Sequence, residues 1–174
     1  MKIQENKIQE HTGTSFSITK VDGISILKFN DRCTINNIED YATIMLGECT
    51  NCEKVKELYK DFTYDKVLVL GLGLGLVPET LKVEKECSVV DVVDNNQELI
   101  DYVDFLHEDI NIISTSNCET YQGSKKYDLI ILEYYHHTDQ FNTPGTMRHN
   151  YVPQLKNSDS VMICPLINKV IENA

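Results

Sequence analysis

The sequence predicts an α/β fold built on a parallel sheet, and three observations lead to this prediction. Short apolar runs rich in Val, Leu and Ile begin at residues 66, 88, 110, 127 and 161. Segments with apolar residues at helical spacing lie between several of these runs. Three glycines at alternate positions, Gly71, Gly73 and Gly75, follow the first run. Strands that alternate with helices form βαβ units, so we expect the strands to be parallel and in the order 3-2-1-4-5.

A small N-terminal extension is expected before this sheet. Residues 1–14 are polar without a period and predict a loose tail. Residues 15–21 and 24–29 alternate apolar and polar side chains around Asp22-Gly23, which is a strong hairpin signal because both turn residues can adopt positive φ. Helical spacing follows from Asn37 and again at residues 55–62. We therefore divide the chain into a tail (1–14), a hairpin with helices (15–62) and the α/β domain (63–174).

The glycine turn is the first candidate site. Glycines directly after a buried strand permit a sharp turn and a close approach of the backbone to a ligand. Pro78, soon after them, is compatible with the first turn of a helix, whose N–H groups would face that ligand. A tight turn without a ligand would look the same. Asp94 favours the ligand, because it ends the second apolar run 19 residues after Gly75, where a ribose diol is held in such folds.

Later strands are predicted at residues 110–114, 127–132 and 161–166, and before them a helix with Leu99, Ile100, Val103 and Leu106 on one face. Asn117 and Glu133 follow the first two of these strands and fall at the same sheet edge as the glycines. Asp91 lies inside an apolar strand, where an unpaired carboxylate is unfavourable. Either it has a partner, or it shares the ribose role with Asp94.

Composition excludes several classes of function. A formal charge of −11 argues against nucleic acid as the main partner. We find no signal peptide or apolar membrane span, so we expect a cytoplasmic protein without a membrane partner. The six cysteines are expected to be reduced and buried. Cys49 and Cys52 have zinc-ligand spacing, but no second pair accompanies them, so no metal site is predicted.

Three stretches carry a resemblance to a known family. They are KVLVLGLGLGLVPETL (66–81), VVDNNQELI (92–100) and NCETYQGSKKYDLIILE (117–133). Together they resemble the Rossmann-like class I S-adenosylmethionine-binding fold. Within that fold the chain is most similar to the spermidine synthase (aminopropyltransferase) family, because YATIML (41–46) resembles that family's YxxML segment. The resemblance implies S-adenosylmethionine or its decarboxylated form as the cofactor.

The resemblance also assigns roles to individual residues. It implies that the glycine turn passes the methionine part of the cofactor, that the acid after the second strand holds the ribose, and that the segment after the third strand reads the adenine. The implied cofactor-binding residues are Gly71, Leu72, Gly73, Gly75, Asp94, Asn95, Asn117, Cys118 and Glu133. Asn117 stands where the family has an Asp, so it can accept a hydrogen bond but carries no charge.

The predicted catalytic residues are Glu133, Tyr134 and His136, of which the resemblance implies Glu133. Glu133 stands where the family has an Asp that accepts the proton of the attacking amine, so its carboxylate lies one methylene further out. His136 replaces the family's second acid, and either His136 or His137 could act as a base near neutral pH. The chain therefore lacks one carboxylate that a polyamine would need.

Two function classes remain open. The first is a transferase that moves a methyl or aminopropyl group to a small acceptor, with an amine as one candidate. The alternative is a non-catalytic protein that binds an adenosyl ligand or acts as an oligomeric scaffold. Class I folds usually continue past the fifth strand with a helix and a hairpin, whereas here residues 167–174 alone follow. We therefore expect that hairpin to be missing and a homo-oligomer to form through the exposed strand at residues 161–166.

Overall fold

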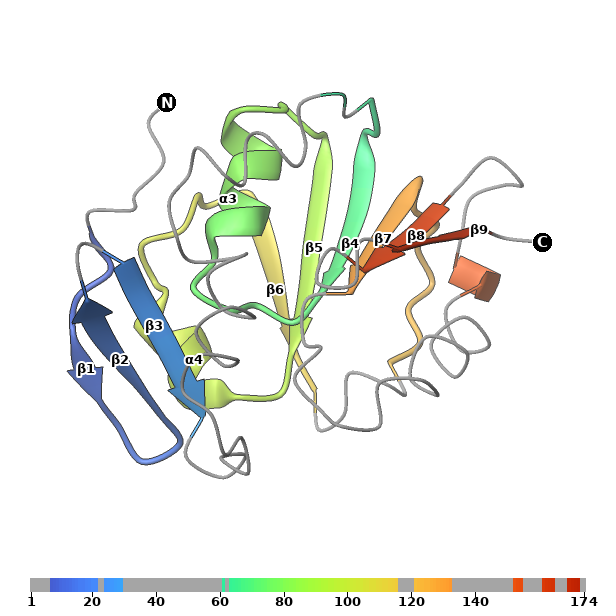
Figure 1. Cartoon of the computed structure of the whole chain (residues 1–174). Coiled ribbons are helices and arrows are strands. Elements are labelled where there is room, and N and C mark those ends of the chain that lie inside the picture. Colours follow the sequence, from blue (N-terminus) through green and yellow to red (C-terminus); the bar gives the residue numbers. More distant parts are fainter. Residues whose placement is uncertain are drawn as a thin grey trace.

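The computed structural model describes residues 7–21, 24–29, 61, 63–115, 121–132, 152–154, 161–164 and 169–172 (Figure 1). These residues form a three-stranded antiparallel sheet and a six-stranded sheet. The small sheet contains β1 (His11–Thr12), β2 (Phe16–Val21) and β3 (Ile24–Phe29). The large sheet contains β4 (Lys66–Leu70), β5 (Val89–Asp94), β6 (Ile110–Ser114), β7 (Leu129–Leu132), β8 (Val161–Cys164) and β9 (Lys169–Glu172). The helical elements are α3 (Leu76–Val83), α4 (Gln97–Tyr102) and the short 3₁₀ helix η3 (Val152–Gln154).

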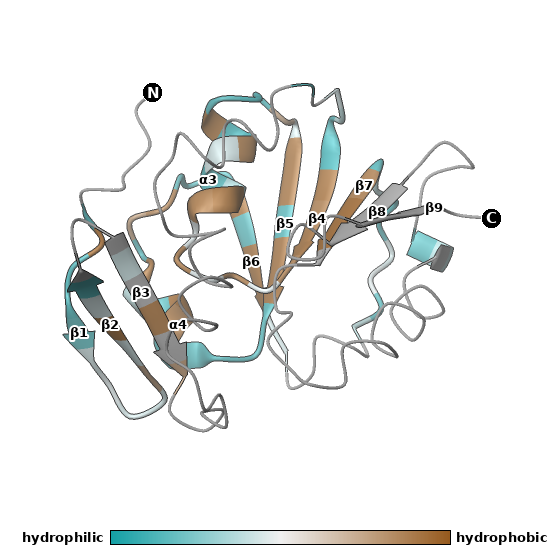
Figure 2. Cartoon of the chain, viewed as in Figure 1, coloured by the Kyte–Doolittle hydropathy of each residue, from teal (hydrophilic) through white to brown (hydrophobic). Residues whose placement is uncertain are grey.

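The large sheet has the predicted topology. Its order is β6-β5-β4-β7-β8-β9, and the first five of these strands are parallel. In chain order these five strands read 3-2-1-4-5, so the predicted α/β fold is confirmed. Both faces of the central strands are buried, as expected for a parallel sheet. Figure 2 shows the resulting apolar residues along β4, β5 and β7.

The other end of the sheet corrects an expectation. β9 pairs antiparallel with β8, from Val161 opposite Glu172 to Cys164 opposite Lys169. β8 is thus hydrogen-bonded on both sides, because it also pairs with β7. The expectation of an open strand edge at residues 161–166 was wrong, and an interface there loses its structural argument. The oligomeric state itself stays a prediction.

The N-terminal hairpin is confirmed, with Val21 opposite Ile24 across a two-residue connection. Asp22 and Gly23 lie outside the described residues, as do the helices expected at residues 37–46 and 55–62, apart from Asp61. The expectation of a loose tail does not hold for residues 7–14. Ile8 is 1% exposed and belongs to the core, and β1 pairs with β2.

Two further observations concern the sequence-based expectations. Cys87 is a buried free thiol, and burial, followed by the nearby Asp65 carboxylate, raises its pKa to about 11. No helix in the described part of the chain is long and apolar enough to cross a membrane.

Candidate cofactor site

The glycine turn joins β4 to α3 and has the predicted conformation. Gly71, Gly73 and Gly75 have φ values of 97°, 53° and 79°, a region that side chains with a Cβ rarely adopt. The Gly71 N–H donates to the Val93 carbonyl at 2.8 Å, which ties the end of β4 to the end of β5. The Gly75 N–H donates back to the Leu72 carbonyl at 3.0 Å. The backbone therefore turns sharply at the carboxyl end of the central strand.

Helix α3 starts directly from this turn. Gly75 is its N-cap in the left-handed conformation, and no side chain caps the helix there. The first turns of a helix contain N–H groups that have no partner within the helix, and they favour negative charge. Glu79, also in the first turn and 2% exposed, accepts the His107 N–H at 2.8 Å. The start of α3, which has backbone N–H groups and no side-chain cap, thus lies beside the ends of β4 and β5.

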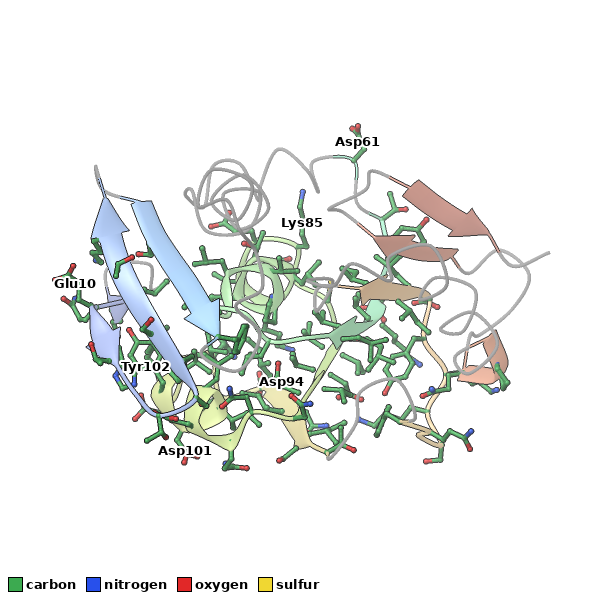
Figure 3. The ribbon with its side chains drawn as sticks, turned by 60° about the horizontal axis from the view of Figure 1, so that its bottom comes forward. Glu10, Asp61, Lys85, Asp94, Asp101 and Tyr102 are labelled. Atoms are coloured by element: carbon green, nitrogen blue, oxygen red, sulfur yellow. The ribbon has the colours of Figure 1, made fainter. Side chains whose placement is uncertain are left out.

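Asp94 connects the two loops of the site. It is the last residue of β5, is 7% exposed and lies near the centre of the view in Figure 3. One carboxylate oxygen, Oδ2, accepts the Leu72 N–H of the glycine turn at 2.8 Å. The other, Oδ1, accepts the Asn96 N–H at 2.8 Å. Two backbone amides from different loops therefore fix the position of the carboxylate.

The segment after Asp94 contributes a residue that the sequence analysis did not single out. Asn96 is the N-cap of α4, and its Oδ1 accepts the Leu99 N–H at 3.0 Å. Its backbone N–H is the second partner of Asp94. Asn95, which was expected to contact the cofactor, is exposed between them. An asparagine directly before a helical apolar pattern is a capping signal, and it could have identified Asn96.

The structure brings together the first group of predicted residues. The glycine turn with Leu72, Asp94 and Asn95 all lie at the carboxyl ends of β4 and β5. Leu132 at the end of β7 pairs with Leu70, so the chain leaves β7 at the same edge. The remaining predicted site residues lie outside the described residues: Asn117, Cys118, Glu133, Tyr134 and His136. Their roles stay predictions.

Asp91 has partners and is not part of this site. It is 1% exposed and accepts hydrogen bonds from Lys125 Nζ at 2.7 Å, Tyr127 Oη at 2.7 Å and Asn111 Nδ2 at 3.0 Å. Successive side chains of a strand point to opposite faces, so Asp91 and Asp94 lie on different faces of β5. The alternative in which Asp91 shares the ribose role is therefore not supported. Within the described residues, no group of three or more His, Cys, Asp or Glu side chains could hold a metal ion.

Comparison with known proteins gives a likeness of fold. No family model and no curated protein sequence matches the chain. Among solved structures, the plantazolicin methyltransferase BpumL, in complex with a pentazolic desmethylPZN analog and SAH, is 20% identical, with a TM-score of 0.50 over 78% of this chain and 49% of that chain. The N-methyltransferase NodS from Bradyrhizobium japonicum WM9, in complex with S-adenosyl-L-homocysteine, is 18% identical, with a TM-score of 0.50 over 65% of this chain and 58% of that chain.

A third structure, the glycopeptide N-methyltransferase MtfA complexed with S-adenosyl-L-homocysteine, is 8% identical, with a TM-score of 0.53 over 65% of this chain and 47% of that chain. The present chain spans about half the length of these enzymes. At this level of identity the comparison shows a likeness of fold alone. The chain has the α/β fold of these methyltransferases.

Proposed function

We propose that this chain binds S-adenosylmethionine and transfers its methyl group to a small acceptor. The observation that carries the proposal is the position of Asp94. Its carboxylate ends the strand beside the glycine turn and is fixed there by the amides of Leu72 and Asn96. The methyltransferases with this fold named above were solved with S-adenosylhomocysteine, the product of such a transfer.

Each part of the site suits one part of this ligand. A carboxylate can accept about four hydrogen bonds, so two backbone contacts do not by themselves preclude hydrogen bonds from a ribose diol to Asp94. The glycine turn offers backbone without side chains to the methionine portion. The start of α3 at Leu76 favours a negatively charged group, such as the methionine carboxylate.

The chemistry places modest demands on the protein. Bound S-adenosylmethionine would supply a methyl group that its positively charged sulfur already activates. An acceptor lone pair forms the new bond to carbon as the carbon–sulfur bond breaks, so the protein needs to align the acceptor and receive its proton. In this proposal Glu133 receives the proton, as the family resemblance implies, and Tyr134 and His136 are the other two predicted catalytic residues.

We propose methyl transfer in preference to aminopropyl transfer. The resemblance to spermidine synthases suggested either reaction, whereas the structural neighbours named above are methyltransferases. The two reactions differ in whether the ligand retains its carboxylate. S-adenosylmethionine and its decarboxylated form therefore discriminate between them.

Calorimetric titration of the full chain tests the proposal. We expect binding of S-adenosylmethionine and S-adenosylhomocysteine, and weaker binding of decarboxylated S-adenosylmethionine and methylthioadenosine. Asp94→Asn should lower the affinity by about 1.5–3 kcal/mol, the contribution of a charge-assisted hydrogen bond. Asp101→Asn is the matched control, because Asp101 is exposed on α4 and accepts Gln97 Nε2 at 2.7 Å, a bond that Asn also accepts.

Unfolding curves of both variants without ligand show whether Asp94→Asn disturbs the glycine turn itself. A wild-type chain that binds none of the four compounds would refute the proposed function. Binding of the decarboxylated form alone would favour aminopropyl transfer. Equal affinities of wild type and Asp94→Asn would show that another residue holds the ribose.

A further inference from the structure

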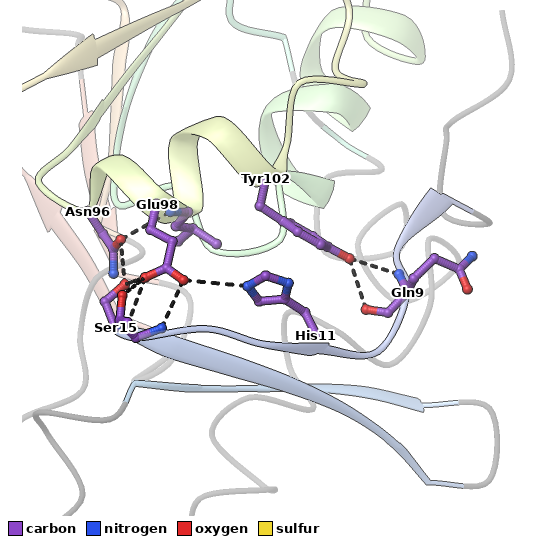
Figure 4. A network of polar contacts seen from close by, with 8 residues as sticks. Gln9, His11, Ser15, Asn96, Glu98 and Tyr102 are labelled. Carbon is purple, nitrogen blue, oxygen red and sulfur yellow. Dashed lines mark hydrogen bonds and ion pairs between the residues drawn. The ribbon is translucent and has the colours of Figure 1, made fainter.

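The segment that precedes β2 meets the N-terminal turn of α4 through one carboxylate (Figure 4). Glu98 Oε2 accepts the Ser15 N–H at 2.8 Å, the Ser15 hydroxyl at 2.7 Å and the Thr14 hydroxyl at 2.8 Å. Glu98 Oε1 accepts the Thr14 N–H at 2.9 Å. These hydrogen bonds lower the pKa of Glu98 to about 2, and the bond from the Ser15 side chain has the largest effect. The carboxylate is therefore ionised at neutral pH.

The Ser15 hydroxyl also lies 3.0 Å from Asn96 Oδ1. A hydroxyl has one proton, so Ser15 donates to Asn96 or to Glu98 at any one time. Asn96 in turn donates its backbone N–H to Asp94. When the Ser15 hydroxyl donates to Asn96, hydrogen bonds therefore link the segment before β2, through the side chain and backbone of Asn96, to the carboxylate of the candidate cofactor site.

Gly13, in the N-terminal segment, packs closely against the side chain of Glu98. A Cβ on Gly13 would collide with Glu98 Oε1 and would lie 2.7 Å from His11 Nε2. The φ of Gly13 is not in the left-handed region, so its role is space and not backbone strain. The His11 ring stacks on Phe16 with centroids 4.7 Å apart, and its Nε2 lies 3.6 Å from Glu98 Oε1.

A second contact holds the same two elements together. The Tyr102 hydroxyl accepts the Gln9 N–H at 2.8 Å and donates to the Gln9 carbonyl at 2.9 Å. The N-terminal segment is therefore attached at both ends of α4, through Glu98 near its start and Tyr102 at its end.

We propose that Ser15 and Glu98 are positioning residues, which hold the Asp94–Asn96 loop in the geometry that binds the ribose of an adenosyl ligand. The inference rests on the proposed function, because it names what controls affinity at that same site. It makes the segment before β2 a part of the cofactor site that acts through Asn96 and Asp94. Loss of the Ser15 hydroxyl then weakens binding of a ligand that carries the ribose diol.

The test measures the affinity of the full chain for S-adenosylhomocysteine and for its 2′,3′-dideoxy analogue. Ser15→Ala should weaken binding of S-adenosylhomocysteine by roughly three- to tenfold, the effect of one hydrogen bond. It should leave the affinity for the dideoxy analogue unchanged, because that ligand lacks the diol. Ser15→Thr retains the hydroxyl and should restore binding. Gly13→Ala, which displaces Glu98 by bulk, should act like Ser15→Ala.

Ser17→Ala on β2 is the matched control, and it should not alter either affinity. Hydrogen exchange of the Leu72 and Asn96 amides without ligand gives an independent measurement, and both amides should exchange faster in Ser15→Ala than in Ser17→Ala. If the wild type binds no adenosyl ligand, the proposed function fails, while faster exchange still supports the positioning of the loop. If the wild type binds but Ser15→Ala matches Ser17→Ala in affinity and exchange, the positioning role is overturned and the proposed function stands.

Discussion

The hydroxyl of Tyr127 donates to the carboxylate of Asp91 at 2.7 Å, inside the sheet. Asp91 is 1% exposed and Tyr127 is fully buried. A buried carboxylate is strongly unfavourable unless charged and polar partners compensate it. Lys125 reaches the same carboxylate from a half-exposed position, and Asn111 donates from β6. The three partners explain how an acidic residue can lie within an apolar strand.

Tyr127→Phe should therefore lower the free energy of unfolding by about 1.5–3 kcal/mol, because it removes a hydrogen bond to a charged group. Denaturation in urea measures this change. The same substitution at Tyr102, whose hydroxyl contacts the Gln9 backbone at an exposed site, should have a smaller effect of about 0.5–1.5 kcal/mol. If Tyr127→Phe lowers the free energy of unfolding no more than Tyr102→Phe does, the role assigned to the Tyr127 hydroxyl is contradicted.

Tyr127 should also be silent in an alkaline titration of the folded protein. Burial, and then the Asp91 carboxylate, raise its pKa well above the ordinary value of 10.0. The raised value means that the neutral phenol stabilises the fold below about pH 10, and that this contribution is lost as the pH rises further. The tyrosinate absorbance of wild type and Tyr127→Phe should rise in parallel around pH 10. If the rise in tyrosinate absorbance near pH 10 is smaller in Tyr127→Phe than in the wild type, Tyr127 ionises at its ordinary pKa.

Glu98 should give the opposite dependence in acid. Hydrogen bonds from Ser15 and Thr14 lower its pKa from 4.5 to about 2. The stabilisation is therefore complete above pH 4.5 and is lost as the pH falls towards 2. The difference in melting temperature between wild type and Glu98→Gln should shrink over this interval, as followed by thermal unfolding.

The exposed Glu108 provides the control for this experiment, since Glu108→Gln should show no such trend. His11 faces the same carboxylate, so the comparison should be repeated with His11→Gln. If the pH dependence of the melting-temperature difference persists in the His11→Gln background, it arises from the contacts of Glu98 with Ser15 and Thr14. A difference that is independent of pH would mean that Glu98 acts by packing alone.

Gly75→Ala tests the turn before α3. Its φ of 79° is unfavourable for a residue with a Cβ, by about 1–2 kcal/mol. An added Cβ would also lie 2.6 Å from Leu106 Cδ2, but the end of a leucine side chain can move. We therefore expect a loss of about 1–2 kcal/mol that remains in a Leu106→Ala background. Recovery of stability in the double variant, measured by a double-mutant cycle, would show that the contact and not the backbone is responsible.

The strands of the parallel sheet could be predicted because their signal is local. The strand predicted at residues 110–114 coincides with β6, and the run from residue 66 coincides with β4. The position of Asp94 at the end of β5, beside the glycine turn, could also be predicted, because its distance from Gly75 is a property of one βαβ unit. Such features depend on residues that are close in sequence, where pattern and turn chemistry act directly.

The features that were missed depend on distant partners. The segment at residues 7–14 has one buried apolar side chain, Ile8, and is otherwise attached to α4 by polar contacts that no periodicity reveals. The partners of Asp91 come from residues 20 to 36 positions later. β9 is a four-residue strand whose identity depends on β8 being available as its neighbour. Sequence patterns show which segments are apolar, but they do not show which distant group will satisfy a polar one.

The attachment of the first strands to α4 has a consequence for biosynthesis. The contacting residues are separated by 83 to 93 positions, so at roughly 5–20 residues per second the ribosome adds Glu98 and Tyr102 about 4–19 s after their partners at residues 9–15. During that interval Gln9, Thr14 and Ser15 remain hydrated, and the hairpin has no helix to dock on. Docking of the segment at residues 9–15 on α4 is thus a late step in synthesis of the chain, and protease access to residues 7–15 on stalled ribosomes should fall when α4 has left the exit tunnel.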